Sequence, residues 1–196
     1  VVIIGVGGVG TVILDSLQRM GFHNFTIIDY DFVEKSNLNR QLLFKEKHIG
    51  EYKVEAVSKE LLTGCNVTKH QKKISSVKDM EDLSIYKADF IINCADTPND
   101  IGNIVHQFAK SYDIPSISGG VGIDSGQWGP IYDESHKFQD GISNNIKIKG
   151  SNASTNAIIS NFMAFEVMLY LSNLYLDYPF YKEKNLNFKT LQMDVY

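Results

Sequence analysis

Hydrophobic and polar positions fall into blocks that predict strands alternating with helices. Residues 1–4 are apolar and β-branched and end at a glycine, which is typical of a buried parallel strand. Apolar residues then recur at helical spacing over residues 9–20, and a glycine at position 21 ends that run. The later blocks predict strands at 25–29, 66–74, 88–96 and 114–122, and helices at 51–62, 101–112 and 153–176.

The C-terminal part of the pattern is less regular. Residues 127–132 predict a strand that pairs antiparallel to its neighbour, and the weak alternation over 186–196 predicts one last edge strand. Residues 133–150 are polar and without period, which indicates a loop. The alternation as a whole predicts an α/β, Rossmann-like fold: a mainly parallel sheet flanked by helices, with antiparallel C-terminal strands.

The length and the apolar runs bound the organisation of the chain. Its 196 residues suit a single domain over 1–196, because no internal repeat or linker divides them. The sequence starts inside a strand without an initiator methionine, so we expect an N-terminal segment, and some C-terminal residues, to be absent from it. The long apolar run at 153–176 is interrupted by polar residues such as Glu166, which favours a buried helix over a membrane span.

Composition narrows the class of protein. Hydrophobic residues at 43% and charged residues at 21% indicate a globular domain. The net charge of -4 gives no reason to expect nucleic acid as a partner. Cys65 and Cys94 lie far apart, so their spacing predicts neither a disulfide framework nor a zinc site. With no signal peptide in the sequence, we expect a cytoplasmic protein that does not bind a membrane.

The stretch GVGGVG follows the first predicted strand and carries the first chemical signal. Gly5, Gly7 and Gly10 fit a dinucleotide-binding fingerprint, and Asp29 ends the second strand about 20 residues later. Such glycines let the backbone approach a phosphate, the next helix offers free N–H groups, and the carboxylate accepts from ribose hydroxyls. A tight turn without ligand is the plain alternative. The motif does not by itself distinguish NAD from ATP, although the extra glycine, Gly8, slightly disfavours the common dehydrogenase form.

The segment DYDFVEKSNLNRQLLF, after the second strand, favours a triphosphate. Arg40 lies within it, Lys53 starts the next predicted helix, and Asp96 follows the fourth strand. Ligands bind at the carboxyl ends of parallel strands, so we expect these side chains to meet there. Two cations would neutralise phosphate oxygens and the carboxylate would hold Mg²⁺. The alternatives are a surface ion pair for Arg40, a solvated helix-start residue for Lys53, and a helix cap for Asp96.

These motifs, in this order and spacing, resemble the ATP-dependent adenylating enzymes that include ThiF, MoeB and the ubiquitin-activating enzymes. The resemblance runs from GVGGVG through DYDFVEKSNLNRQ, IGEYK and CADTP to the glycine-rich strand after Pro115. The stretches FKEKHIGEYK and GPIY are similar to the MccB-type branch, which adenylates a short ribosomal peptide. The resemblance implies a nucleotidyltransferase: a C-terminal carboxylate attacks the α-phosphate of ATP, giving an acyl-adenylate and pyrophosphate. The acceptor would be a ubiquitin-like protein, a sulfur carrier or a short peptide.

The same resemblance implies roles for individual residues. Arg40, Lys53 and Asp96 would be catalytic, with Asp96 as the Mg²⁺ ligand. Gly8 would approach the phosphates and Asp29 the ribose. Asp31 is counted in the ATP set, although a surface or turn charge is its alternative reading. The whole ATP-binding set is Gly5, Gly7, Gly8, Gly10, Asp29, Asp31, Ser36, Asn37, Arg40, Lys53, Asp96 and Thr97.

The chain departs from the family in two respects. Many members carry two CxxC pairs that bind zinc, which this sequence lacks, so we expect no zinc. Neither Cys65 nor Cys94 stands where a thioester-forming cysteine is expected, which favours adenylation alone or attack by a small nucleophile.

Family members form symmetric dimers, so the resemblance implies a homodimer. Two other functions stay open at this point: an NAD-dependent oxidoreductase, and a non-catalytic partner subunit of an adenylating enzyme.

Overall fold

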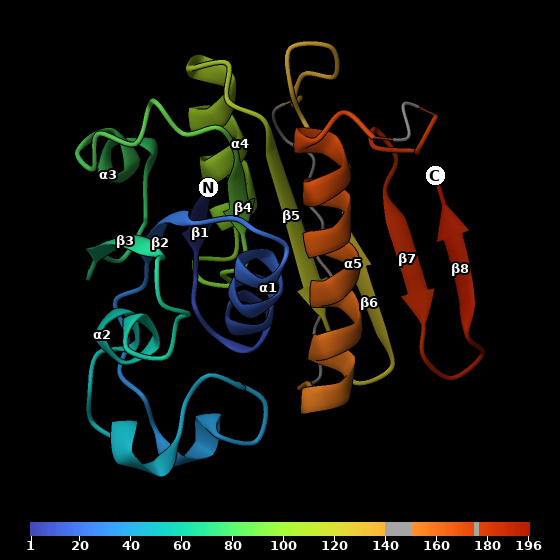
Figure 1. Cartoon of the computed structure of the whole chain (residues 1–196). Helices are drawn as coiled ribbons and strands as arrows, with labels where there is room; N and C mark the ends of the chain where they lie inside the picture. The colour runs from blue at the N-terminus through green and yellow to red at the C-terminus, as the bar shows by residue number, and fades with distance from the viewer. Residues whose placement is uncertain (140–149, 175–176) are drawn as a thin grey trace.

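The computed structural model describes residues 1–139, 150–174 and 177–196. Within these residues the strands form one eight-stranded sheet in the order β3-β2-β1-β4-β5-β6-β7-β8 (Figure 1). The first five strands in the chain pair in parallel and the last three join antiparallel. They are β1 (Val2–Ile4), β2 (Asn24–Ile28), β3 (Asn66–His70), β4 (Ile91–Asn93), β5 (Ser116–Val121), β6 (Ser125–Trp128), β7 (Lys184–Asn187) and β8 (Gln192–Val195).

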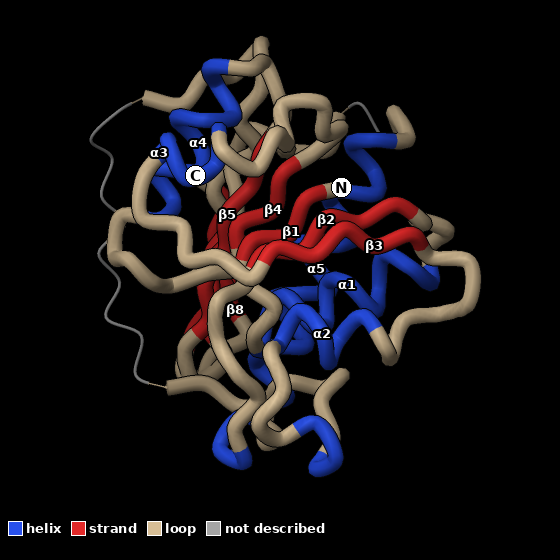
Figure 2. The backbone as a smooth tube through the Cα atoms, turned by 90° about the vertical axis from the view of Figure 1, so that its left-hand side faces the viewer, coloured by secondary structure: helices blue, strands red, loops and turns tan. Residues whose placement is uncertain are grey.

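Helices cover both faces of this sheet, as Figure 2 shows. On one face lie α1 (Gly8–Arg19), α2 (Lys53–Ser58) and α5 (Ala153–Leu171), and on the other α3 (Val77–Glu81) and α4 (Ile101–Ser111). Each face has its own hydrophobic core, since the side chains of β1 alternate between them: Ile3 packs with the α1 side and Val2 and Ile4 with the α4 side. The predicted Rossmann-like fold is confirmed.

Several predicted elements need correction, and the strands predicted at 66–74 and 88–96 are shortened to β3 and β4. The predicted helix at 51–62 ends at Ser58, because the chain turns so that the Leu62 N–H donates to Gln18 Oε1 at 2.8 Å. The single strand predicted at 186–196 is the hairpin β7–β8. The strand predicted at 127–132 lies at 125–128, and the helix predicted to 176 ends at Leu171. Of the loop predicted at 133–150, residues 140–149 lie outside those described.

Helix α3 was not predicted. Its residues are mostly polar and show no helical period, and the only local signal is the N-cap, where Ser76 Oγ accepts from the Asp79 N–H at 3.2 Å. Two 3-10 turns, η1 (Lys35–Asn37) and η2 (Glu46–His48), lie in the long connection between β2 and α2. That connection carries the polar segment singled out above.

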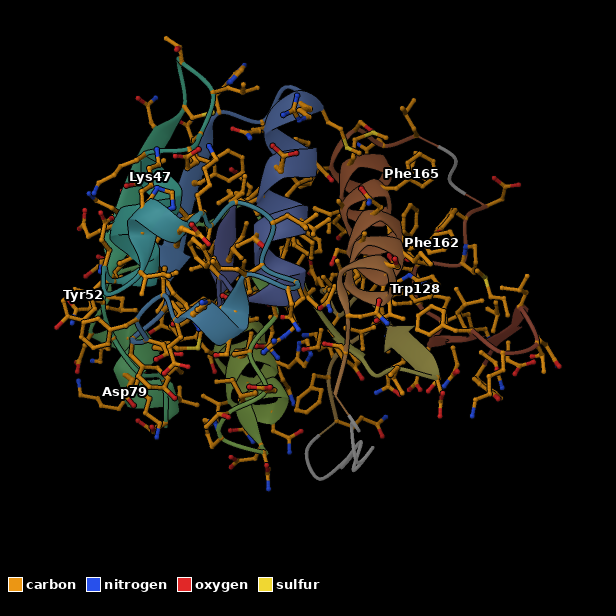
Figure 3. All side chains as sticks on the ribbon, turned by 90° about the horizontal axis from the view of Figure 1, so that it is seen from below. Lys47, Tyr52, Asp79, Trp128, Phe162 and Phe165 are labelled. Carbon is orange, nitrogen blue, oxygen red and sulfur yellow. The ribbon has the colours of Figure 1, made fainter. Side chains whose placement is uncertain are left out.

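Helix α5 packs closely on the antiparallel part of the sheet. A Cβ on Gly119 would lie 2.3 Å from Met163 Sδ, and one on Gly126 would lie 2.3 Å from Ile159 Cγ1. Glycine therefore makes room for this helix on β5 and β6. Trp128 stacks on Phe162 with ring centroids 5.0 Å apart, where α5 meets β6 (Figure 3). Among the described helices, α5 included, none is long and apolar enough to cross a bilayer.

A buried ion pair joins β7 to α5. Glu166 is fully buried and Lys184 is 2% exposed, and their Oε1 and Nζ atoms lie 2.5 Å apart. Glu166 Oε2 also accepts from Trp128 Nε1 at 2.8 Å and from the Tyr178 hydroxyl at 3.4 Å. Burial raises the pKa of Glu166 and lowers the pKa of Lys184, so desolvation opposes both charges despite their attraction.

Candidate functional site

The loop between β1 and α1 brings backbone to the carboxyl end of the sheet. Gly5 has a φ of +84°, and a Cβ there would lie 2.9 Å from the Ala95 nitrogen. A Cβ on Gly10 would lie 2.0 Å from the Gly5 carbonyl oxygen, so glycine is required for α1 to pack on this loop. Gly7 is the N-cap of α1 and offers no side-chain cap. The first N–H groups of α1 are therefore available to an anion.

Gly8 faces a side chain from the far end of the sequence. A Cβ on Gly8 would lie 2.5 Å from Asn156 Oδ1, which belongs to α5. Asn156 is 2% exposed, and its Nδ2 donates to the Asn152 carbonyl at 2.7 Å. This asparagine lines the same cleft as the glycine loop. The sequence analysis does not include Asn156 in the candidate site. The one sequence feature that could have indicated it is a polar amide within an otherwise apolar helix.

Asp29 ties the glycine loop to the end of β2. Its Oδ2 accepts from the Val6 N–H at 2.8 Å and its Oδ1 from the Asp31 N–H at 2.9 Å. A carboxylate has about four lone-pair sites, so two backbone bonds leave it able to accept from further hydroxyl groups. The predicted ribose ligand is thus also a support of the loop.

Lys53 and Asp31 form an ion pair at the edge of the cleft. Lys53 begins α2, its side chain is 8% exposed, and its Nζ lies 2.7 Å from Asp31 Oδ2. Burial raises the pKa of Asp31, but the hydrogen bonds from Lys53 and from the Phe32 N–H outweigh it, and the pKa is lowered. Lys53 is therefore not the solvated helix-start residue of the alternative reading.

The connection after β2 adds an arginine and an asparagine to the cleft. Asn37 is 8% exposed, and its Oδ1 accepts from the Glu34 N–H at 3.0 Å. Arg40 Nη1 donates to the Ser36 carbonyl at 3.2 Å and to Asn39 Oδ1 at 2.8 Å, rather than to a carboxylate. The surface ion pair considered for Arg40 is therefore not what the structure shows.

Gln41, beside this arginine, is a residue that the candidate set left out. It is 4% exposed, lines the cleft, and its Nε2 would lie 3.6 Å from a Cβ on Gly7. Its Oε1 is buried without a hydrogen-bond partner among the described residues. Buried polar atoms are usually paired, so this amide is a candidate contact for a ligand at the glycine loop.

Asp96 and Thr97 follow β4 on the opposite side of the glycine loop. Asp96 is exposed, and its Oδ1 accepts from the Thr97 hydroxyl at 3.2 Å. The N-cap of α4 is Asp100, so the helix-cap reading of Asp96 is wrong. In the described part of the chain no cluster of three or more His, Cys, Asp or Glu could hold a metal alone. A single carboxylate nevertheless suits Mg²⁺, which takes one or two carboxylates together with phosphate oxygens and water.

Most of the predicted residues line one open cleft of about 1450 Å³ at the carboxyl ends of the parallel strands. Gly10 is used inside the β1–α1 turn, and Ser36 is exposed with its hydroxyl donating to Glu34 Oε2 at 2.9 Å. Neither of them lines the cleft. Those that do are Gly5, Gly7, Gly8, Asp29, Asp31, Asn37, Arg40, Lys53, Asp96 and Thr97.

Cys94 also lines the cleft and is half-buried. Burial raises the pKa of its thiol well above the ordinary range, which keeps it protonated at neutral pH. Cys65 lies elsewhere, with its Sγ 3.8 Å from Gln18 Oε1. The cleft therefore offers cations, amides, helix N–H groups and carboxylates, of which Asp96 and Asp100 are exposed, but no activated thiol at Cys94.

Comparison with known proteins connects this arrangement to one family. All of residues 1–196 match the ThiF family. A NEDD8-activating enzyme E1 catalytic subunit of Dictyostelium discoideum is 46% identical over 77 residues, which cover 38% of this chain and 17% of that protein. A SUMO-activating enzyme subunit 2 of the same organism is 31% identical over 130 residues, covering 65% of this chain and 19% of that protein. The chain thus spans about a fifth of the length of these relatives.

Solved structures share the fold. E. coli MccB with ATP superposes with a TM-score of 0.88 at 24% identity, over 100% of this chain and 62% of that one. PaaA superposes with a TM-score of 0.81, also at 24% identity, over 100% and 62% of the two chains. At this level of identity the likeness concerns the fold.

Proposed function

Because the chain belongs to the ThiF family, we propose that it binds ATP and Mg²⁺ in this cleft and adenylates a C-terminal carboxylate. The acceptor would be a ubiquitin-like protein, a sulfur carrier or a short peptide. One observation carries the proposal: Arg40, Lys53 and Asp96, far apart in sequence, line a single cleft with the glycine loop. The NEDD8- and SUMO-activating enzymes among the relatives support this class of acceptor.

The shape and the donors of the cleft suit a nucleotide. Gly8 leaves open a space that a Cβ would close against Asn156, next to the unpaired N–H groups at the start of α1. Asp29 would accept from the ribose hydroxyls. Arg40, with its planar fork of donors, and Lys53 would bind oxygens of the triphosphate. Asp96 would hold Mg²⁺, which neutralises phosphate charge when bound.

The chemistry asks for placement and charge neutralisation rather than a protein nucleophile. The acceptor carboxylate attacks the α-phosphorus, a P–O bond forms, and the bond to the leaving pyrophosphate breaks. Arg40 and Lys53 would stabilise the negative charge that accumulates on the oxygens of the leaving group. Cys94 has a pKa raised by burial, so we propose that the acyl group is not passed to it as a thioester.

ATP–pyrophosphate exchange with candidate acceptors tests the proposal. Arg40→Ala and Asp96→Ala should each abolish the exchange, and Arg19→Ala is the matched control. The Arg19 side chain is 63% exposed and pairs with Asp15 on the outside of α1, so its removal changes charge equally and leaves the cleft intact. Exchange that survives both cleft variants refutes the assignment. Binding of NAD without any requirement for Mg²⁺ would instead support an oxidoreductase, and binding of neither nucleotide a non-catalytic subunit.

We further propose that the chain acts as a homodimer that covers the outer side of α5. Ile158 is 40% exposed and Phe165 is 42% exposed, seven residues apart on this helix, and Figure 3 shows Phe165 on the side away from the sheet. Analytical ultracentrifugation should show a dimer for the wild type and a monomer for Phe165→Lys. A wild-type monomer at all concentrations would refute the homodimer.

A further inference from the structure

A chain of hydrogen bonds links the buried face of α4 to β5 and, through it, to the end of β4. His106 Nδ1 lies 2.8 Å from Ser116 Oγ, and His106 Nε2 lies 2.8 Å from Ser118 Oγ. Asn93 Nδ2 donates to the same Ser118 oxygen at 3.2 Å. Asn93 ends β4 and is the register partner of Ser118 within β5, so the histidine, which bonds two serines of β5, is linked to β4 through Ser118.

The network continues into the turn that carries Asp96. Asn93 Oδ1 accepts from the Ala95 N–H at 3.2 Å, which bends the chain directly after β4. Asp96 is the next residue. The turn also packs against the glycine loop, because a Cβ on Gly5 would lie only 2.9 Å from the Ala95 nitrogen. A shift of this turn would therefore move the Asp96 carboxylate and, at the same time, disturb the glycine loop.

Three members of the network are buried, and Ser118, which links His106 to Asn93, is half-buried. His106 is 4% exposed, Asn93 is 3% exposed and Ser116 is fully buried. Buried polar groups are costly unless they are hydrogen-bonded, and here both ring nitrogens of the histidine have partners. Its ring also packs against Tyr132 and Phe138, with centroids 4.7 and 5.2 Å away. The imidazole therefore has one orientation available to it.

The arrangement Ser118–His106–Ser116 has the order of a nucleophile, a base and an orienting group, but its chemistry is different. Burial lowers the pKa of His106 to about 3, which leaves the imidazole a poor proton acceptor at neutral pH. Ser116 is a neutral hydroxyl and cannot stabilise an imidazolium as a carboxylate would. Since proton abstraction is disfavoured, the histidine acts through its hydrogen bonds.

We propose that His106 is a positioning residue that, through Ser118 and Asn93, fixes the turn bearing Asp96 and so sets the affinity of the cleft for Mg²⁺ with ATP. This inference rests on the proposed function. It concerns a residue that touches neither the nucleotide nor the metal in that proposal. Hydrogen-bonding partners that orient a metal ligand typically change metal affinity by about 10–100-fold when they are removed.

Calorimetric titration of ATP at a series of Mg²⁺ concentrations tests this without an acceptor. His106→Phe retains an aromatic ring but removes both hydrogen bonds, and Ser118→Ala removes the link to Asn93. Both should raise the half-saturating Mg²⁺ concentration by about tenfold or more. Phe108→Leu is the control, since Phe108 is fully buried in the hydrophobic core on the same helix and its side chain makes none of the hydrogen bonds of this network. It should lower the melting temperature and leave the Mg²⁺ requirement unchanged.

A double-mutant cycle separates positioning from plain structural support. In an Asp96→Ala background, His106→Phe should add nothing to the loss of Mg²⁺ affinity, because both changes act on one group. Additive losses, or a His106→Phe variant that changes only the melting temperature, would overturn the inference and leave the proposed function standing. A wild-type chain that binds no ATP at any Mg²⁺ concentration would overturn both.

Discussion

The buried pair of Glu166 and Lys184 makes a quantitative prediction about stability. In Lys184→Met, Glu166 keeps its bonds from Trp128 and Tyr178 but loses the cation that lies 2.5 Å from its Oε1. A buried unpaired carboxylate escapes its desolvation penalty by taking up a proton. The variant therefore trades an ion pair for a neutral carboxyl group, and its stability becomes dependent on pH.

The cost follows from the protonation. Protonating a glutamate at pH 7 against an unfolded-state pKa of about 4.3 costs about 3.7 kcal/mol, at about 1.36 kcal/mol per pH unit, and at pH 5 about 1 kcal/mol. The sign is fixed: a folded-state pKa raised above the unfolded one gives stability that is present below the unfolded pKa and lost as pH rises. At pH 7 the loss agrees with the usual range of about 3–5 kcal/mol for a broken buried pair. It corresponds to a fall in melting temperature of about 7–15 °C.

Urea unfolding of wild type and variant at pH 5, 6 and 7, followed by circular dichroism, measures the difference at each pH. The other titratable groups are the same in wild type and variant, so their effect on the unfolding free energy cancels in the difference between the two proteins. Adding Glu166→Gln to Lys184→Met removes the charge but keeps an acceptor for the Trp128 N–H, so this double variant should recover most of the stability at pH 7 and show no extra pH dependence. An equal loss for Lys184→Met at pH 5 and pH 7 would refute the reasoning.

Three further predictions concern single positions. Gly8→Ala should abolish ATP binding measured by thermal shift, because its Cβ would lie 2.5 Å from Asn156 Oδ1, and a second change, Asn156→Ala, should restore part of it. Gly119→Ala should cost about 1–3 kcal/mol of unfolding free energy through overlap with Met163, and Met163→Ala should relieve the overlap in a chemical denaturation experiment. Lys53→Met should weaken ATP binding in calorimetry by about tenfold or more, since a charge-assisted bond to phosphate is lost, whereas unchanged affinity would remove Lys53 from the site.

Sequence reasoning succeeded where the signal is local. The β-branched run before GVGGVG, the helical period after it and the position of Asp29 at a strand end are all set by neighbouring residues. Because parallel strands deliver their carboxyl ends to one edge, the meeting of Arg40, Lys53 and Asp96 at one cleft also followed from the order of elements.

It failed where tertiary contacts decide. The turn between β7 and β8 places Leu191 at a φ of +57° without a glycine or asparagine at that position, so the sequence pattern predicts one strand where the structure has a hairpin. Asn156 and His106 have no sequence motif, since their roles come from α5 reaching the glycine loop and from α4 lying beside the strand tips. The family resemblance implies that Ser36 contacts ATP, yet its hydroxyl donates to Glu34 and the residue does not line the cleft.

The pairing of β6 with β7 bears on how the chain is synthesised. The partners Trp128 and Lys184, and Ser125 and Asn187, are about sixty residues apart, with α5 between them. At about 5–20 residues per second, a ribosome needs about 3–12 s to deliver β7 after β6 has emerged. During that interval β6 exposes unpaired backbone groups of the kind that recruit foreign strands. Its four residues, SGQW, offer a short and glycine-containing edge, which limits such mispairing until the hairpin arrives.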